Sequence, residues 1–242
     1  MTRRRLNDII KEGMFGKSAV GLYRRLFKLR RKISRNDEKI VEQYFAHHAI
    51  AKLQLGCGGN LLDGWLNSDF FPKAPNVIHV DATTTYPFRD QTFDYVFSEH
   101  MIEHVPYEDG HSMLKESWRV LKEGGKIRIS TPDLAFLIAL YQPEKTPLQE
   151  EYIRWYSKEI PLPLACDTFI INNFVRAWGH QFIYDEKALR FSLKQAGFAD
   201  ITRLSLNESG EAAFRNLENE RRSPEGFVKL ESLTLEGTKT SA

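Results

Sequence analysis

A short apolar segment runs directly into three glycines at Leu53-Gln54-Leu55-Gly56-Cys57-Gly58-Gly59-Asn60. Glycine is needed where the backbone turns sharply and where a ligand comes so close that a Cβ atom would obstruct it. A strand followed at once by such a turn is typical of the sheet edge at which α/β proteins hold nucleotides. The sequence therefore predicts a strand, a glycine loop and a bound ligand here.

Two better-known glycine motifs do not fit this loop. A dinucleotide fingerprint needs glycine or alanine at its sixth position and an acidic residue about 20 positions farther on. Counted from Gly56, the sixth position is Leu61, and Asp69 follows after only thirteen residues. A phosphate-binding P-loop is excluded because no Gly-Lys-Ser/Thr follows. What remains is a loop for a nucleoside ligand without a pyrophosphate.

From Ala51 onward, short apolar runs alternate with helical stretches, which predicts an α/β domain. The expected strands are Ala51–Leu55, Leu66–Phe70, Val77–Val80, Phe93–Phe97 and Lys126–Thr131, with Ala199–Leu206 and Val228–Glu236 as later candidates. A helical period from Met113 to Leu121 ends at Glu123-Gly124-Gly125, and a helix over Asp185–Ala196 ends at Gly197. The first of these helices predicts a right-handed crossover between parallel strands, the unit of a doubly wound sheet.

Two aspartates close neighbouring strands of this sheet. Asp69 follows Leu66-Asn67-Ser68, and Asp81 follows Val77-Ile78-His79-Val80. Because the carboxyl ends of parallel strands face one crevice, Asp69 is placed to accept hydrogen bonds from ribose hydroxyls, with Asp81 farther along, near the exocyclic amine of a base. The alternative is that each aspartate caps a turn. Combined with the glycine loop, the pair favours a nucleoside site.

Five segments follow one another in the order found in a known family. They are Leu53–Asn60, Gly64–Asp69, Asp81-Ala82, Phe93–His100 and Trp118–Gly125. As a set they resemble the class I S-adenosylmethionine-dependent methyltransferases, particularly the small bacterial type 11 group. The resemblance implies an α/β fold with a doubly wound, Rossmann-like seven-stranded sheet whose last strand is antiparallel. It also implies S-adenosyl-L-methionine as the cofactor.

The resemblance assigns roles to individual cofactor-binding residues. It places Gly56, Gly58 and Gly59 beside the methionine part of the cofactor, Asp69 at its ribose, and Asp81 with Ala82 at its adenine. The expected cofactor site also includes Cys57, Asn60 and Ser98.

The sequence departs from the family after the glycine loop. The family commonly has another glycine where this chain has Asn60, and only Leu61–Gly64 separates Asn60 from Trp65. These four residues make about one helical turn, too little for the family's first helix. We therefore expect another segment, with Ile40–Ala51 as the candidate, to close the floor of the cofactor site.

The chain divides into a basic helical N-terminal arm at residues 1–45 and a methyltransferase domain at residues 46–242. Within the domain, a helical insertion near residues 134–178, interrupted by prolines, is a natural substrate cover. Residues 1–35 carry twelve basic and two acidic side chains, although the whole chain has a net charge of only +2. With Val20, Tyr23 and Phe27 at helical spacing, the arm could pack on the domain, rest on an anionic membrane or touch nucleic acid.

Location and partners are bounded by what the sequence lacks. No apolar run approaches the roughly 18–20 residues of a membrane-spanning helix, and the first residues do not resemble a signal peptide. The two cysteines form no disulfide framework and no zinc-binding pair. We expect a cytoplasmic protein, with residues 1–35 allowing peripheral contact with the inner membrane face. Relatives that methylate nucleic-acid bases commonly carry an Asn/Asp-Pro-Pro-aromatic motif after the fourth strand. This sequence has no such motif there, so no nucleic-acid partner is expected.

Histidines supply the candidate catalytic groups. Methyl transfer needs mainly alignment, but a hydroxyl acceptor benefits from a general base, and histidine, with a pKa near 6.5, is suitable. His100, just past the fourth strand, is the first candidate and His180 the second. We predict methyl transfer to an oxygen or nitrogen atom of a small molecule or glycan. The main alternative is a binding module with a methyltransferase fold and no turnover.

A third function is suggested by His-x-x-Glu-His over residues 100–104, formally the inverted zinc-protease pattern. On a helix, His100 and His104 would share a face, with Glu103 beside them. The segment instead begins at a strand end, and Pro106 interrupts it almost at once. A zinc hydrolase is therefore the least favoured of the three functions, and no metal ligand is predicted.

Overall fold

The computed structural model describes residues 36–160 and 162–240. Most of the predicted arm, and with it the amphipathic helix and the membrane contact assigned to residues 1–35, lies outside the described residues. The rest of the arm belongs to helix α3, Asn36–His47. No helix of the described ranges is long and apolar enough to cross a membrane.

A single mixed sheet organises the described part of the chain. Its seven strands lie in the order β3-β2-β1-β4-β5-β7-β6. They are β1 Lys52–Leu55, β2 Leu66–Asp69, β3 Ile78–His79, β4 Phe93–Glu99, β5 Leu121–Pro132, β6 Phe198–Leu204 and β7 Ser232–Lys239. Strands β1 to β5 are parallel, and β7 is antiparallel to both of its neighbours. The predicted doubly wound sheet with an antiparallel last strand is confirmed.

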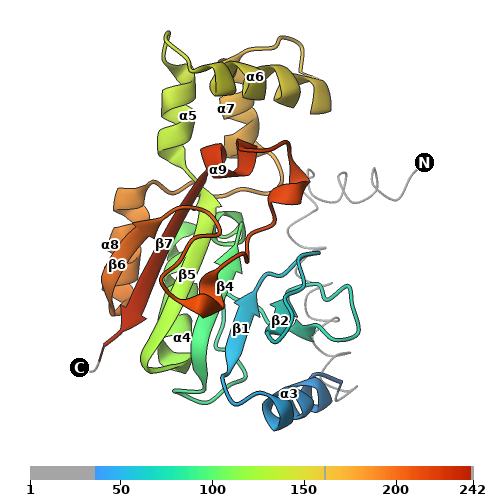
Figure 1. The fold of residues 1–242 in the computed structure, drawn as a ribbon, viewed down its shortest axis with the longest axis vertical. Helices are drawn as coiled ribbons and strands as arrows, with labels where there is room; N and C mark the ends of the chain where they lie inside the picture. The colour runs from blue at the N-terminus through green and yellow to red at the C-terminus, as the bar shows by residue number, and fades with distance from the viewer. Residues whose placement is uncertain (1–35, 161, 241–242) are drawn as a thin grey trace.

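One face of the sheet carries the main apolar core. Helices α4, Tyr107–Val120, and α8, Glu186–Ala196, lie behind the strands in Figure 1. Side chains from both helices pack on the sheet in one buried cluster, which includes Leu53, Val96, Met113, Leu114, Ile129, Leu189 and Leu193. The limits predicted for α8 are confirmed, because the Asp185 side chain caps its first turn and Gly197, with φ +104°, ends it.

Helix α4 ends earlier than the glycines at positions 124 and 125 suggested. The chain turns into an extended conformation at Leu121, which is fully buried and pairs with Phe93 in the sheet. Gly124, with φ +74°, therefore lies within the long strand β5 and not at the end of a helix. The predicted helix end was wrong because burial of Leu121 beside β4 outweighs the local glycine signal.

The other face of the sheet is covered by the connection from β6 to β7, residues 205–231, which crosses in front of β5, β4 and β1 in Figure 1. It contains the short elements η2 Ala212–Phe214, η3 Glu220–Arg222 and α9 Phe227–Glu231. The predicted strand over Val228–Glu236 was wrong in its first part, where α9 forms. The reason is tertiary: Phe227 is buried against Tyr152, with 5.1 Å between their ring centroids.

A helical insertion extends beyond β5, at the end of the molecule opposite α3 (Figure 1). It consists of α5 Leu134–Tyr141, α6 Pro147–Glu159 and α7 Asp167–Arg176, with a core of its own. Thr146 and Gln149 form a capping box at the start of α6. The predicted helices are present, and their role as a substrate cover stays a prediction.

Helix α3 anchors the beginning of β1. Tyr44 accepts a hydrogen bond from the Lys52 amide, at 2.7 Å, and its hydroxyl lies 3.1 Å from the Lys52 carbonyl oxygen. Because Lys52 is the first residue of β1 and Gly56 follows the last, Tyr44 and its helix turn lie at the opposite end of the strand from the glycine loop. The segment Ile40–Ala51 therefore does not close the floor of the predicted cofactor site.

Candidate functional site

The glycine loop makes the sharp backbone turn that its sequence predicted. Gly56 and Gly58 have φ values of +68° and +54°, in the left-handed region that favours glycine. The turn is closed by hydrogen bonds from the Cys57 amide to the Ser68 carbonyl, 2.9 Å, and from the Asn60 amide to the Cys57 carbonyl, 2.8 Å. A Cβ atom added at Gly58 or Gly59 would meet no other atom within 4 Å. This side of the loop is open to a ligand.

Asp69 and the glycine loop are in direct contact. At the end of β2, Asp69 accepts a hydrogen bond on Oδ2 from the Gly58 amide, 2.9 Å, and on Oδ1 from the Phe71 amide, 2.7 Å. Each carboxylate oxygen has a second lone pair that can accept from a ligand. Asp69 is half-buried, so that a ligand on the open side of the loop can reach it.

The second predicted aspartate, Asp81, forms hydrogen bonds within the turn that follows it. Asp81 accepts hydrogen bonds on Oδ1 from the Thr83 amide, 3.2 Å, and from the Thr83 hydroxyl, 2.7 Å. The neighbouring Ala82 side chain is buried in the main core. The turn-capping interpretation of Asp81 is thus present in the structure, and an adenine contact stays a prediction.

Three other predicted cofactor residues have different surroundings. Burial, together with the charge of Asp69, raises the pKa of the Cys57 thiol to about 12, so that it stays protonated near neutral pH. The Ser98 hydroxyl is buried and makes no hydrogen bond within the described chain. Asn60 donates from Nδ2 to Glu99 Oε2, 3.0 Å, and to the Leu217 carbonyl, 2.9 Å. Asn60 therefore ties the glycine loop to β4 and to the β6–β7 connection.

That connection covers the sheet face beside the short segment between β1 and β2. Phe214 and Leu217 pack against Trp65 and Phe97 on the face of the sheet beside the glycine loop. Glu99, which sequence reasoning did not single out, accepts the Asn219 amide at 2.9 Å and so holds the connection at the end of β4. Its position at a strand end was the only signal in the sequence.

His100 lies at the carboxyl end of β4 in an uncommon conformation, with φ +46°. Its Nε2 atom is 2.6 Å from Arg222 Nη2 and 3.1 Å from the Ser232 hydroxyl. Because a guanidinium only donates, Nε2 must accept, which puts the ring proton of the neutral histidine on Nδ1. Nδ1 lies 3.3 Å from Glu103 Oε1. The His100 ring is thus oriented with Nδ1 toward the Glu103 carboxylate and Nε2 away from it.

Glu103 is the common neighbour of three histidines. It is fully buried, and its Oε2 accepts a hydrogen bond from the Thr131 hydroxyl, 3.1 Å. Its Oε1 lies 3.9 Å from His104 Nε2, and the ring centroids of His104 and His180 are 4.8 Å apart. Burial raises the pKa of Glu103, but His100 and His104 lower it by more, and the result is below its ordinary value.

His180 reaches this cluster from the loop after α7. Its Nδ1 lies 2.6 Å from the Phe174 carbonyl oxygen, to which it donates. Burial lowers the pKa of His180 by more than the Glu103 carboxylate raises it, which favours a neutral ring. The structure therefore brings both predicted base candidates to one buried carboxylate. Sequence reasoning considered Glu103 only within a zinc-protease motif, and no local signal connects it to His180.

That zinc-protease pattern does not have the required structure. Residues Ile102–His104 form one turn of 3₁₀ helix, ended by an extended Val105, where the motif needs a continuous α-helix. His100 precedes this turn. The two histidines of the motif therefore do not share a helical face.

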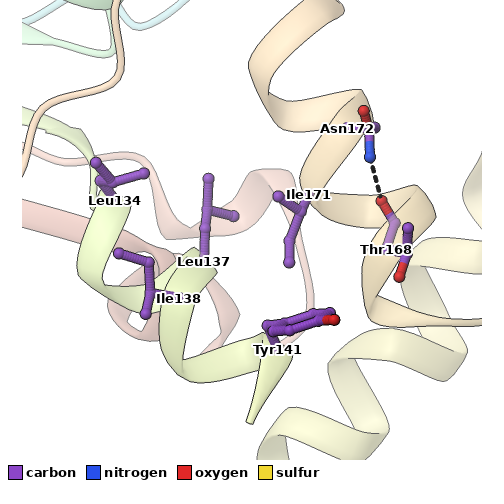
Figure 2. Close-up of a pocket in the computed structure, with 7 residues that line it drawn as sticks. All are labelled: Leu134, Leu137, Ile138, Tyr141, Thr168, Ile171 and Asn172. Atoms are coloured by element: carbon purple, nitrogen blue, oxygen red, sulfur yellow. Dashed lines mark hydrogen bonds between the residues drawn. The ribbon is translucent and has the colours of Figure 1, made fainter.

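A separate apolar cavity of about 290 Å³ opens between α5 and α7 (Figure 2). It is lined by Leu134, Leu137, Ile138, Tyr141, Thr168, Ile171 and Asn172. The Asn172 side chain is turned to the Thr168 carbonyl, to which it donates at 2.9 Å. No predicted site residue lines this cavity. Its lining residue Leu134 is the first residue of α5, and only Asp133, the N-cap of α5, separates it from the end of β5.

Comparison with known proteins identifies a similar family for the segment that follows the glycine loop. Residues 60–129 match the family model described as a methyltransferase domain. The matched segment, less than a third of the chain, includes β2, β3, β4 and most of β5. The predicted resemblance is confirmed, and the match supports an enzyme over a binding module without turnover. No curated protein sequence matches the chain.

Solved structures that are similar to this chain include proteins described as methyltransferases. One, a SAM-dependent methyltransferase from Archaeoglobus fulgidus, is 16% identical, with coverage of 86% of this chain and 94% of the other and a TM-score of 0.47. A possible histamine N-methyltransferase from Thermotoga maritima is 18% identical, with coverage of 91% and 96% and a TM-score of 0.45. Phosphoethanolamine N-methyltransferase 2 from Haemonchus contortus is 16% identical, with coverage of 86% and 53% and a TM-score of 0.44. At these identities the acceptor of this chain does not follow from them.

Proposed function

We propose that the protein binds S-adenosyl-L-methionine at the glycine loop and transfers its methyl group to an oxygen or nitrogen atom of a small molecule or glycan. The observation that carries the proposal is the open side of the loop at Gly58 and Gly59, directly beside the Asp69 carboxylate. Both lie at the carboxyl end of β1 and β2, where α/β sheets bind nucleotides. The family match over residues 60–129 supports the same activity.

The residues of the loop fit this cofactor. Gly58 and Gly59 leave space for the methionine part, and Asp69 has free lone pairs for the two ribose hydroxyls. The cofactor, when bound, supplies a methyl group that its sulfonium already activates. The protein then has to hold the acceptor in line with that methyl group, because alignment supplies most of the acceleration.

His100 is the proposed general base for a hydroxyl or ammonium acceptor. Its Nε2 accepts hydrogen bonds, and its Nδ1 faces the buried Glu103 carboxylate at 3.3 Å. A proton taken up at Nε2 produces an imidazolium whose charge Glu103 stabilises. An acceptor that binds at Nε2 displaces Arg222, whose side chain is partly exposed. His180 is the less favoured candidate, because its Nδ1 is held by the Phe174 carbonyl.

Calorimetric titration of S-adenosylmethionine and S-adenosylhomocysteine tests the cofactor site. We expect Asp69→Ala to weaken binding by roughly 100-fold, since two hydrogen bonds to a charged group contribute about 3 kcal/mol together. Asp69→Asn keeps one side-chain oxygen that can accept from the Gly58 amide, and so helps to separate ligand binding from loop folding. Asp63→Ala removes an exposed carboxylate from the connection between β1 and β2, and this variant is expected to bind S-adenosylmethionine as the wild-type protein does. Absence of binding in the wild-type protein would refute the proposal.

The role of His100 is tested with an acceptor identified by transfer of a labelled methyl group. We expect His100→Ala to lower kcat by about 10²–10⁴-fold, the usual contribution of a general base. The affinity for S-adenosylmethionine should stay unchanged, because the His100 side chain bonds to Ser232 and Arg222 and not to the glycine loop. An unchanged kcat would remove His100 from the mechanism.

The basic residues 1–35 support a more specific acceptor, a saccharide precursor on a lipid carrier at an anionic membrane surface. Co-sedimentation with liposomes that contain anionic lipids tests this part. Deletion of residues 1–35 is expected to abolish sedimentation with the liposomes. Sedimentation that persists without residues 1–35 would leave the lipid-linked acceptor without support.

A further inference from the structure

We propose that Glu103, His104 and His180 form a binding site for one divalent transition-metal ion, with Zn²⁺ as the reference ion. Within the described chain, these three residues each offer one ligand atom, and the three atoms lie within 4.8 Å of one another. Ligands at about 2.0–2.2 Å from a tetrahedral ion are roughly 3.3–3.6 Å apart. Small side-chain rotations therefore suffice to bring the three atoms onto one ion.

The buried carboxylate is the observation that points to an ion. Glu103 is fully buried, and its Oε2 is satisfied by the Thr131 hydroxyl. Its Oε1 makes no well-aligned hydrogen bond, although His100 Nδ1 is 3.3 Å and His104 Nε2 3.9 Å away. A buried carboxylate oxygen that faces histidine nitrogens without an aligned hydrogen bond is incompletely satisfied, and a cation between Oε1, His104 and His180 would complete its interactions.

The two histidines are prepared as ligands. His180 donates from Nδ1 to the Phe174 carbonyl, which leaves Nε2 as the nitrogen with a free lone pair. Metal-binding histidines usually donate their second nitrogen to a carbonyl or carboxylate in this way. His104 presents Nε2 toward Glu103, and its side chain is 37% exposed, so that an ion can enter from solvent. Glu103 in turn has the Thr131 hydroxyl as its outer partner.

The backbone already holds the three ligands in place. Gln181 donates its amide to the Glu103 carbonyl, 2.7 Å, and its side chain to the His104 carbonyl, 2.8 Å. The loop that carries His180 is thereby fixed against the turn that carries Glu103 and His104. A bound ion would join the end of α7 to the carboxyl end of β4, beside His100 and apart from the glycine loop.

The donor set selects the class of ion. Two imidazoles and one carboxylate suit Zn²⁺ and neighbouring first-row ions and leave at least one position for water. Mg²⁺ and Ca²⁺ prefer oxygen ligands and are disfavoured. This site shares no ligand with the proposed cofactor site, so binding of the metal and binding of S-adenosylmethionine are tested separately.

Calorimetry on the full-length protein, treated with a chelator and then titrated with Zn²⁺, tests the site. We expect one ion per chain, and visible absorption typical of four-coordinate Co²⁺ when Co²⁺ replaces Zn²⁺. His104→Ala and His180→Ala should each weaken Zn²⁺ binding by at least about 10-fold, since even outer partners of metal ligands contribute 10–100-fold. His47→Ala, an exposed histidine of α3, is the matched control and should bind Zn²⁺ as the wild-type protein does.

Two results would overturn the site. One is wild-type protein that binds no Zn²⁺ at one ion per chain. The other is binding that persists in folded His104→Ala, which would place the ion elsewhere. Because the His104 side chain is partly exposed, its removal should leave the thermal unfolding of the apo-protein close to wild type, so that lost binding reports on the ligand. Equal binding of Mg²⁺ and Zn²⁺ would also contradict the proposed donor set.

Discussion

The connection from β1 to β2 and the connection from β6 to β7 meet at Asn60, and they hold their shapes by different means. The first is short and depends on its backbone, with left-handed glycines at positions 56 and 58 and hydrogen bonds back to β2. The second, residues 205–231, is long and depends on side chains, with Phe214 and Leu217 packed on the sheet. A loop that shapes a ligand site must be local, whereas a cover for a sheet face can come from a distant part of the chain.

The second connection also buries charge. Arg128 on β5 is fully buried and donates from Nε to Glu218 Oε1, 2.6 Å, and from Nη1 to Glu236 Oε1, 2.6 Å. Nη1 also donates to the Glu208 carbonyl, and Nη2 donates to the Ser205 carbonyl. Because loop-closure entropy rises slowly with length, a long connection can cover this face at little extra cost. The ion pairs then determine where it lies.

The largest effect is expected from Glu218→Ala. Removal of one partner leaves part of the buried Arg128 guanidinium without a counter-charge, which typically costs about 3–5 kcal/mol. For a chain of this size that corresponds to a decrease in Tm of roughly 10 °C. Urea and thermal unfolding measure the change. Glu225→Ala removes an exposed carboxylate from the same connection and should change stability by less than about 0.5 kcal/mol.

A Glu218→Ala protein as stable as Glu225→Ala would mean that the long connection does not depend on its buried charges. Glu218→Gln adds a finer test, since it keeps a hydrogen-bond acceptor for Arg128 but removes the charge. Its stability should lie between those of the wild-type protein and Glu218→Ala.

Two alanine substitutions test how far the short connection depends on its glycines, and we expect them to lower the stability of the protein by different amounts. A Cβ at Gly56 would lie 2.5 Å from Met101 Cγ, whereas one at Gly58 meets no atom within 4 Å. Both positions have a positive φ, which costs an alanine about 1–2 kcal/mol. Overpacking adds about 1–3 kcal/mol at Gly56 alone. In chemical denaturation, Gly56→Ala should therefore be less stable than Gly58→Ala.

Equal stability of the two variants would mean that Met101 moves freely and does not limit the loop. A larger loss in Gly58→Ala would contradict the open space around a Cβ atom at Gly58.

Local patterns were sufficient wherever an element depends on its own residues. The strand before Gly56, helix α8 between Asp185 and Gly197, and the insertion helices could all be predicted, because caps, glycines and prolines act within a few positions. The end of α4 at Val120 and the helix α9 could not, since Leu121 and Phe227 are placed by contacts with distant segments.

The candidate site divides in the same way. The contact of Asp69 with the glycine loop could be predicted from strand order, because the carboxyl ends of β1 and β2 are adjacent. The meeting of Glu103 with His180 could not, since the insertion lies between them in sequence and no spacing rule connects them. Asn60 was predicted as a cofactor residue, and its observed partners belong to β4 and the long connection.

The smallest effect is expected where the two connections meet, in Asn60→Ala. This change removes two hydrogen bonds, to Glu99 and to the Leu217 carbonyl, and should cost about 1 kcal/mol because water can reach the half-buried position. Thermal unfolding measures it against Asn76→Ala, an exposed asparagine. If the two connections stabilise each other, the double variant with Glu218→Ala loses less than the sum of the single losses, by about 0.5 kcal/mol or more. Strict additivity would instead mean that the glycine loop keeps its shape without the long connection, and that the two segments are neighbours but not partners.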